Sequence, residues 1–327
     1  MPEWSGDGSV RGLRAVVLEN WRLRVVVLPG LGGRIWSVRL KPLDRELLWH
    51  HPRRAPRPAP FGACFDDWFA GGWDELFPND APAVLDGEPL PDHGEWWALP
   101  SDWRVEERSG AVVLRLSGAG VVTQHHWERT IELRGDEPTL RLATTIRNQG
   151  VRPLPFLWRT HPALPVAPGA RIELPADRVT VDPAFSPGLE PGPFAWPLAR
   201  TTGGDTVDLS VCPEPGPDRA LLAYATGLRA GWCALTGADG AGVGFAFDPA
   251  AIDTVTLFAS FGGWHGLETV VLEPGVGWPY DLDAARANGS AGTLEPGGTA
   301  TFDVAMVAYE GMSRIDAISP EGEVLGR

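Results

Sequence analysis

Alternation of apolar and polar residues is the dominant pattern along this chain. Residues 140–146 show it most clearly, because Leu140, Leu142 and Ile146 occupy alternate positions and Arg141 lies between two of them. A period of two residues is typical of an antiparallel strand with one buried face. Similar runs predict strands at 23–28, 112–116, 127–133, 140–146, 255–259 and 302–308.

Helix signals are nearly absent, because 40 Gly and 32 Pro among 327 residues leave few stretches for a 3.6-residue apolar period. Many short strands separated by turn residues predict an all-β fold, a large antiparallel β-sandwich. Length alone favours two domains, but sandwiches often remain single at this size. We expect one sandwich domain over residues 11–315, with an N-terminal tail at 1–10 and a C-terminal tail at 316–327.

Two long segments interrupt the alternation. Residues 52–110 are rich in Pro, Gly, Trp and acidic residues, and residues 183–220 repeat Pro-Gly motifs. Loops of this length inside a compact domain are usually functional. The first segment contains the polar motif Asp92-His93-Gly94-Glu95. We therefore predict that it forms a wall of a functional site.

Charge and cysteine content exclude several classes of function. With 42 acidic and 28 basic residues the chain has a net charge of −14, which argues against nucleic acid and anionic membranes as partners. No apolar run approaches the roughly 20 residues of a membrane span, and no secretion signal is recognisable. The 3 cysteines are too scattered for a disulfide framework or a zinc motif. We expect a soluble cytoplasmic monomer or homodimer without a metal.

Candidate acid–base chemistry lies in three polar motifs, at 92–95, 159–162 and 272–274. His161 and Glu273 each precede a proline, which restricts the backbone to extended conformations and suits groups that must be held in place. A histidine and a carboxylate directed into one cleft can transfer protons to and from a substrate. The alternative is purely structural: a core histidine with satisfied hydrogen bonds and a carboxylate at a strand end.

Other polar and aromatic residues accompany these motifs. Arg159 lies two residues before His161, so the two share a face if the segment is a strand. Several of the 15 tryptophans lie in or beside the polar motifs, where flat rings could pack on a sugar or simply fill the core. The glycine-rich run at 30–35 lacks the third glycine of a dinucleotide-binding fingerprint.

Several short motifs in order resemble the aldose 1-epimerase (galactose mutarotase-like) superfamily. The matching pieces are Val27–Ile35, Gly71–Pro78, Asp92–Glu95 followed by Trp103, the turn at Asn148, then His161, and finally Leu272-Glu273-Pro274. Each piece is short, and the resemblance rests on their order and spacing through most of the chain. It implies a large antiparallel β-sandwich, a small-molecule sugar substrate and no metal or organic cofactor.

The resemblance also implies roles for the three motifs: His161 as general acid, Glu273 as general base and His93 as an assisting donor. Glu273 would take the proton of the anomeric hydroxyl while His161 protonates the ring oxygen, and reclosure would give the other anomer. We expect the nearby carboxylate to favour the charged imidazolium of His161.

We expect the substrate to contact further residues, namely Arg159, Asp74, Glu95, Trp73, Trp97, Asp182, Trp278 and Arg34. The ring-binding aspartate of the family corresponds to either Asp182 or Asp74. Because acids outnumber arginines here, a neutral aldose is favoured over a sugar phosphate. Alternatives are a sugar-phosphate mutarotase and a non-catalytic carbohydrate-binding or regulatory protein of the same fold. A lyase or glycosidase would need a tyrosine base or two close carboxylates.

Overall fold

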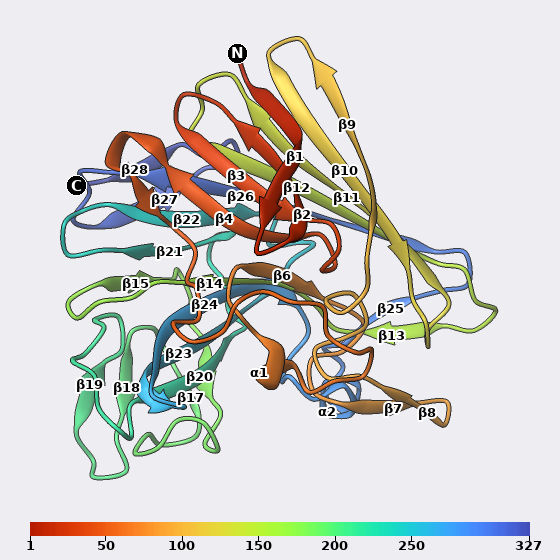
Figure 1. The fold of residues 1–327 in the computed structure, drawn as a ribbon. Helices are drawn as coiled ribbons and strands as arrows, with labels where there is room; N and C mark the ends of the chain where they lie inside the picture. Colours follow the sequence, from red (N-terminus) through yellow and green to blue (C-terminus); the bar gives the residue numbers. More distant parts are fainter. The chain divides into compact units, whose positions relative to one another are not determined.

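The computed structural model describes residues 1–327 as an all-β protein, as predicted, with large antiparallel sheets (Figure 1). Only two short α-helices occur, α1 (Phe65–Trp68) and α2 (Leu282–Ala287), and neither is long and apolar enough to cross a membrane. The chain forms two compact units. The first contains residues 1–161 and 276–304, and the second contains residues 162–275 and 305–327. The single domain at 11–315 remains a prediction.

The first unit contains one sheet in the order β1-β2-β3-β4-β6-β14 and another in the order β9-β10-β11-β12. The first sheet consists of β1 (Glu3–Val10), β2 (Leu13–Glu19), β3 (Leu23–Leu28), β4 (Arg34–Leu40) with β5 (Arg45–Glu46) beside it, β6 (Trp73–Leu76) and β14 (Trp158–Leu164). The second consists of β9 (Asp102–Arg108), β10 (Ala111–Ala119), β11 (His125–Arg134) and β12 (Thr139–Asn148). A 3-10 turn (Lys41–Leu43) follows β4.

These two sheets pack face to face within the first unit, with β1–β4 in front of β10–β12 in Figure 1. Gly33 lies against Leu116 of the facing sheet so closely that a Cβ would lie 2.8 Å from the leucine Cδ1. A buried ion pair joins Glu75 of β6 to Arg129 of β11 at 2.9 Å, and Thr144 of β12 donates to the same carboxylate. The expected sandwich is present in this unit.

Two small two-stranded antiparallel sheets complete the first unit. They are β7 (Ala83–Leu85) with β8 (Glu88–Leu90), and β13 (Leu154–Phe156) with β25 (Gly292–Leu294). Buried leucines at 90, 157 and 282 pack α2 against this region. Strand β26 (Thr299–Tyr309) begins in the first unit and ends in the second.

The second unit contains a sheet in the order β24-β23-β20-β16-β17 and another in the order β15-β21-β22. The first is built from β24 (Leu267–Val276), β23 (Thr254–Trp264), β20 (Ala220–Ala225), β16 (Val179–Val181) and β17 (Pro193–Phe194). The second is built from β15 (Arg171–Glu173), β21 (Trp232–Thr236) and β22 (Gly242–Phe247). Strands β18 (Leu198–Arg200) and β19 (Thr206–Asp208) form a separate pair.

Both terminal segments are more ordered than the tails that we expected. Glu3–Val10 is a strand paired with β2. At the other end, β27 (Ile315–Ile318) and β28 (Val324–Gly326) form a hairpin, and Ile315 and Ile318 pack on Trp232 in a buried cluster. The alternation at the N-terminus is weak because its apolar residues are few, so the sequence alone did not reveal this strand.

Candidate active site

Strand β14 places Arg159 and His161 on one face. All seven of its residues are buried, and its alternate side chains diverge as strand geometry requires. On one face Trp158 stacks on Phe302, and Thr160 accepts a hydrogen bond from Trp73. Arg159 and His161 occupy the opposite face, in agreement with the expectation from their spacing.

The imidazole of His161 is enclosed by aromatic rings. Phe65 and Phe69 meet it edge-on with centroids 5.5 Å away, and the ring of His93 lies at 5.8 Å. Only 7% of His161 is exposed, and its Nδ1 is buried with no hydrogen-bond partner. Burial, followed by the positive charge of His93, holds the pKa of His161 well below its usual 6.5. His161 is therefore neutral near pH 7, opposite to the charged form that we expected.

His93 is the histidine that carries the charge. Its Nδ1 lies 2.8 Å from Oδ1 of Asp92, and its Nε2 lies 3.7 Å from Oδ1 of Asp80. Its ring stacks on Phe65 at a centroid distance of 4.0 Å. Burial disfavours the charged form, but the bond to Asp92 and the charges of both carboxylates outweigh it and raise the pKa of His93 to about 9. At neutral pH the histidine pair thus carries one positive charge, on His93.

A left-handed turn presents His93 to the site. His93 has a φ of 59° and Gly94 a φ of 74°. A Cβ at Gly94 would lie 2.3 Å from the carbonyl oxygen of Phe77, so only glycine fits there. The backbone N–H of His93 donates to the carbonyl of Asp80 at 2.6 Å. The motif at 92–95 therefore encodes a specific turn as well as a titratable group.

Asp92 holds in place Phe65 and Trp97, which form an aromatic wall beside the histidines. Its Oδ2 accepts from the backbone N–H of Phe65 at 2.8 Å, and its carbonyl accepts from Nε1 of Trp97 at 2.9 Å. Burial acts to raise the pKa of Asp92, but hydrogen bonding to His93 and its charge lower it overall. Trp97 is buried edge-on against Phe65. Trp97 thus supports the wall and is not the exposed sugar platform that we expected.

Both arginines that we expected to bind substrate are buried and paired with carboxylates. Nε of Arg34 lies 2.8 Å from Oδ1 of Asp74, and Nε of Arg159 lies 2.9 Å from Oδ2 of Asp80. Arg159 also donates to two backbone carbonyl oxygens in the loop after β24, at 3.3 Å each. These contacts engage the guanidinium of Arg159 within the protein, which argues against its predicted role as a substrate ligand.

Asp80 is a site residue that the sequence did not reveal. One of its oxygens faces Arg159 and the other faces His93, so it joins the two cations. Phe65 and Phe69 were also missed, because they lie in the Pro-rich segment without strand or helix periodicity. Proximity to the Phe77-Pro78 motif was the only signal for Asp80, and it does not specify a role.

Asp74 and Trp73 are neighbours on β6 and have different environments. Oδ2 of Asp74 is buried without a hydrogen-bond partner, and burial raises the pKa of Asp74 despite the adjacent Arg34. Trp73 is only 1% exposed and donates its indole N–H to Thr160. Asp74 therefore keeps an oxygen available for a ligand, whereas Trp73 belongs to the interior, contrary to our expectation of a sugar contact.

Glu95 is a structural anchor, and its predicted role as a substrate ligand is not supported. Its carboxylate is fully buried and accepts from the backbone N–H groups of Val121, Val122 and Thr123 at 2.5, 2.6 and 3.0 Å. The hydroxyl of Thr123 donates to it as well, at 2.5 Å. Four donors use its accepting capacity, so Glu95 holds the loop before β11 in place.

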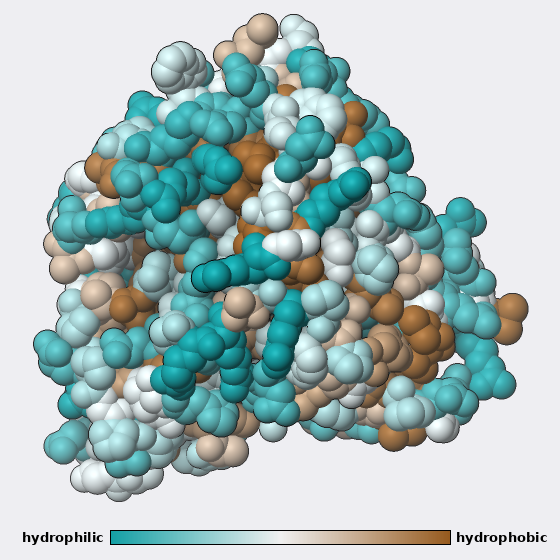
Figure 2. Space-filling model, viewed as in Figure 1, coloured by the Kyte–Doolittle hydropathy of each residue, from teal (hydrophilic) through white to brown (hydrophobic).

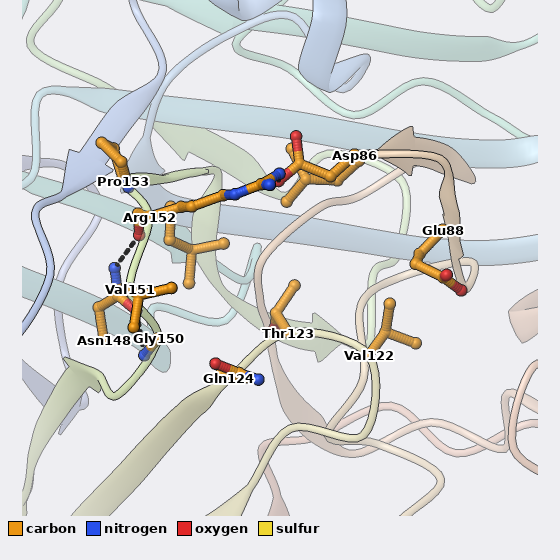
Figure 3. Close-up of a pocket in the computed structure, with 12 residues that line it drawn as sticks. Asp86, Glu88, Val122, Thr123, Gln124, Asn148, Gly150, Val151, Arg152 and Pro153 are labelled. Atoms are coloured by element: carbon orange, nitrogen blue, oxygen red, sulfur yellow. Dashed lines mark hydrogen bonds and ion pairs between the residues drawn. The ribbon is translucent and has the colours of Figure 1, made fainter.

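That loop also lines a separate surface cavity of about 240 Å³ (Figure 3). The cavity lies among the β7–β8 turn, the loop before β11 and the loop before β13, and Figure 3 shows Arg152 extended towards Asp86, its ion-pair partner at 3.2 Å. Apolar surface is visible near β7, β8 and α2 in Figure 2, and Val84 of β7 is exposed. None of the predicted catalytic residues lines this cavity.

Trp278 lies in the loop between β24 and α2. Its backbone N–H donates to the hydroxyl of Ser290 at 3.0 Å, and its carbonyl accepts from Ser290 and Asn288. These bonds fix the backbone while the residue remains partly exposed. A role for its ring in sugar binding remains a prediction.

Glu273 lies in the second unit, on β24. It is directly opposite Thr256 of β23, which in turn is opposite Tyr224 of β20, and Tyr224 is opposite Thr180 of β16. Directly opposed residues project from the same face of a sheet. The carboxylate of Glu273 therefore lies on the same face as these hydroxyl-bearing side chains, and Glu273 is buried.

Asp182 follows β16 on this sheet, and its carboxylate accepts from the backbone N–H of Ala184 at 2.9 Å. Three strand spacings, about 14 Å in total, separate β16 from the strand of Glu273. One small sugar ring cannot bond to two carboxylates so far apart. A ring-binding role for Asp74 or for Asp182 stays a prediction. Within the whole chain no three His, Cys, Asp or Glu side chains are grouped as metal ligands.

Comparison with solved structures identifies the fold. A candidate aldose 1-epimerase from Klebsiella pneumoniae superposes with a TM-score of 0.76 and 15% identity, over 94% of this chain and 83% of that chain. A galactose mutarotase-like protein from Clostridium acetobutylicum superposes with a TM-score of 0.68 and 11% identity, over 95% and 99% of the two chains. No protein-family model matches the sequence.

A TPR-domain-containing protein from Parabacteroides distasonis superposes with a TM-score of 0.68 and 16% identity over 94% of this chain. This chain spans about half of that protein's length, 49%. At these identities the comparisons show the fold alone. The fold is that of galactose mutarotase-like proteins, as the sequence motifs indicated.

Proposed function

We propose that this protein is an aldose 1-epimerase that interconverts the α and β anomers of a neutral aldose. The observation that carries the proposal is the histidine pair of the first unit. One member is charged, and the other is neutral with a buried, unpartnered Nδ1. Buried polar groups are almost always hydrogen-bonded. The unpartnered Nδ1 of His161, beside the cationic His93, therefore favours a site in which a bound ligand supplies the missing hydrogen bond.

Ring opening needs one proton to leave the sugar and one to arrive. In the proposed reaction Glu273 removes the proton of the anomeric hydroxyl, the C1–O5 bond breaks, and its electron pair moves to the ring oxygen. The ring oxygen takes a proton from the histidine pair, and a C1–O1 double bond forms. After rotation about C1–C2, the reverse proton transfers close the ring as the other anomer. Glu273 and the histidine pair then return to their initial protonation states.

The raised pKa of His93 modifies the role that we first expected for His161. His93, between Asp80 and Asp92, is the proposed acid, because its raised pKa keeps it protonated at neutral pH. His161 is the neutral partner, which holds the ring oxygen by a hydrogen bond. Asp74, through its unpartnered Oδ2, is the proposed ligand of a ring hydroxyl.

Charge pairing favours a neutral sugar over a sugar phosphate. Phosphate groups are normally held by arginine or lysine side chains, backbone amides or helix N-termini. Arg34 and Arg159 are each paired with a carboxylate of the protein. The net charge of −14 also disfavours the approach of an anion.

The decisive experiment is saturation-transfer NMR of the anomeric protons of a panel of aldoses with the purified protein. Exchange above the buffer rate is expected for at least one neutral aldose, and Glu273→Gln should lower it by about 10²-fold or more. Glu173→Gln is the matched control, because Glu173 is another buried carboxylate of the second unit. Binding of a sugar without exchange would favour the alternative, a non-catalytic carbohydrate-binding protein.

A further inference from the structure

The sheet that carries Glu273 has one apolar and one hydroxyl-rich face. The row Val181, Ala223, Leu257 and Leu272 crosses four strands and is entirely apolar. The adjacent row, one residue along each strand, is Thr180, Tyr224, Thr256 and Glu273. Successive residues of a strand point to opposite faces. The hydroxyl groups are therefore gathered on the face of the carboxylate.

This hydroxyl-rich face is buried where Glu273 lies. Glu273 is 4% exposed, Thr256 is 1% exposed and Tyr224 is 2% exposed. A carboxylate withdrawn from water needs hydrogen-bond donors to remain charged, and it must remain charged to act as a base. A hydroxyl on the same face of the sheet can serve as such a donor.

Neighbours of Glu273 on β24 and β23 include one hydroxyl directly opposite it. Along β24, Val271 and Gly275 flank it on the same face, and neither side chain has a donor. On β23 the hydroxyl of Thr254, diagonally placed, donates instead to Asp253 at 3.0 Å. Thr256 is directly opposite, and opposed Cβ atoms are about 4.5–5.5 Å apart, within reach of a hydroxyl–carboxylate bond.

We propose that Thr256 is a positioning residue whose hydroxyl donates a hydrogen bond to the carboxylate of Glu273. The bond holds one carboxylate oxygen, keeps the group ionised and leaves the other oxygen for the anomeric hydroxyl. This inference rests on the proposed function, because that function makes Glu273 the base. It adds a residue that neither the sequence motifs nor the comparisons indicate.

The test uses three variants of the full chain. Thr256→Val removes the hydroxyl and keeps the shape, Thr256→Ser restores the hydroxyl, and Thr254→Val is the matched control on the same strand and face. We expect Thr256→Val to lower kcat for anomer exchange about 10-fold with KM within about twofold, because the bond orients the base and not the sugar. Thr256→Ser and Thr254→Val should both stay within about threefold of the parent protein.

A second measurement does not depend on activity. Carbon-13 NMR of labelled glutamate carboxyls, with Glu273 assigned by Glu273→Gln, should show a rise of about one unit in the pKa of Glu273 in Thr256→Val only. Equal effects of Thr254→Val and Thr256→Val, or an unchanged titration, overturn the proposal. If the parent protein exchanges no aldose, the proposed function fails and the titration still decides the hydrogen bond. If Thr256→Val does not fold, Thr256→Ala replaces it in both measurements.

Discussion

Two buried histidines of the first unit, His125 and His161, show how a structural site differs from a candidate active site. Nε2 of His125 accepts from Trp96 at 2.7 Å, and its Nδ1 lies 2.7 Å from the hydroxyl of Thr123, which donates to Glu95. Both ring nitrogens are satisfied. His161 is also buried, but its Nδ1 has no hydrogen-bond partner.

Burial is the first cause of a lowered pKa at both histidines, to about 4 for His125 and well below 6.5 for His161. Burial and a shifted pKa therefore do not separate the two roles. Two features distinguish the histidines. Nδ1 of His161 lacks a hydrogen bond, and the charged neighbours differ in sign: the anion Glu95 lies beside His125, and the cation His93 lies beside His161. A hydrogen-bond network in which every buried polar atom has a partner stabilises the fold. A network with an unpartnered atom can accept a hydrogen bond from, or donate one to, a ligand.

The largest expected effect is on catalysis, at the candidate active site around His161. His161→Asn should lower anomer exchange by about 10²-fold or more, because it removes the hydrogen bond that holds the ring oxygen beside the charged His93. The melting temperature should change little, since Nδ1 of His161 makes no hydrogen bond to another residue. Exchange is measured by NMR on a confirmed substrate. Parent-like exchange in this variant would remove His161 from the mechanism.

Substitution of His125, whose two ring nitrogens are both bonded, should instead lower stability. His125→Leu leaves the buried indole N–H of Trp96 without an acceptor, while Thr123 keeps its bond to Glu95. The free energy of unfolding should fall by about 1–3 kcal/mol. Denaturant unfolding of His125→Leu and His161→Leu measures the difference. An equal loss of stability in the two variants would erase the distinction between the sites.

The two regions should respond to opposite ends of the pH scale. The pKa of His93 is about 9 in the folded protein, above the usual 6.5, so its stabilisation is present below pH 6.5 and lost as pH rises through 9. The pKa of His125 is about 4, below 6.5, so the folded state loses stability as pH falls from 6.5 towards 4. Exchange should decline through pH 9.

NMR titration of the imidazole signals checks this prediction, with His93→Asn to assign the signal. His265→Asn is a matched control, because His265 also has a positive φ, 51° against 59° for His93, and asparagine tolerates that conformation. A His93 signal that titrates near 6.5 would contradict the proposed charge state.

The smallest expected effect concerns substrate charge. Glucose 6-phosphate and galactose 6-phosphate should exchange about 10-fold more slowly than the free sugars at matched ionic strength, since both site arginines are already paired. A clear preference for a phosphorylated sugar would show that the pairing of Arg34 or Arg159 opens on binding. Arg34→Lys and Arg159→Lys would then identify which one binds the phosphate.

Much of the fold was predictable because it depends on local pattern. The run Leu23–Leu28 is strand β3, with the bounds that alternation predicted, and the other five predicted strands lie within observed ones. Spacing of two residues placed Arg159 and His161 on one face. The N-terminal strand was missed because its sequence has few apolar residues to mark a buried face.

The sequence by itself determined where most strands run and which motifs carry titratable groups. Only the tertiary structure decided that Glu95 is saturated by donors at 121–123, that Asp80 joins Arg159 to His93, and that the pKa of His93 is raised while that of His161 is lowered. The reason is physical: strand period is a property of neighbouring residues, whereas hydrogen-bond satisfaction and pKa depend on burial and on charges brought close from distant parts of the chain.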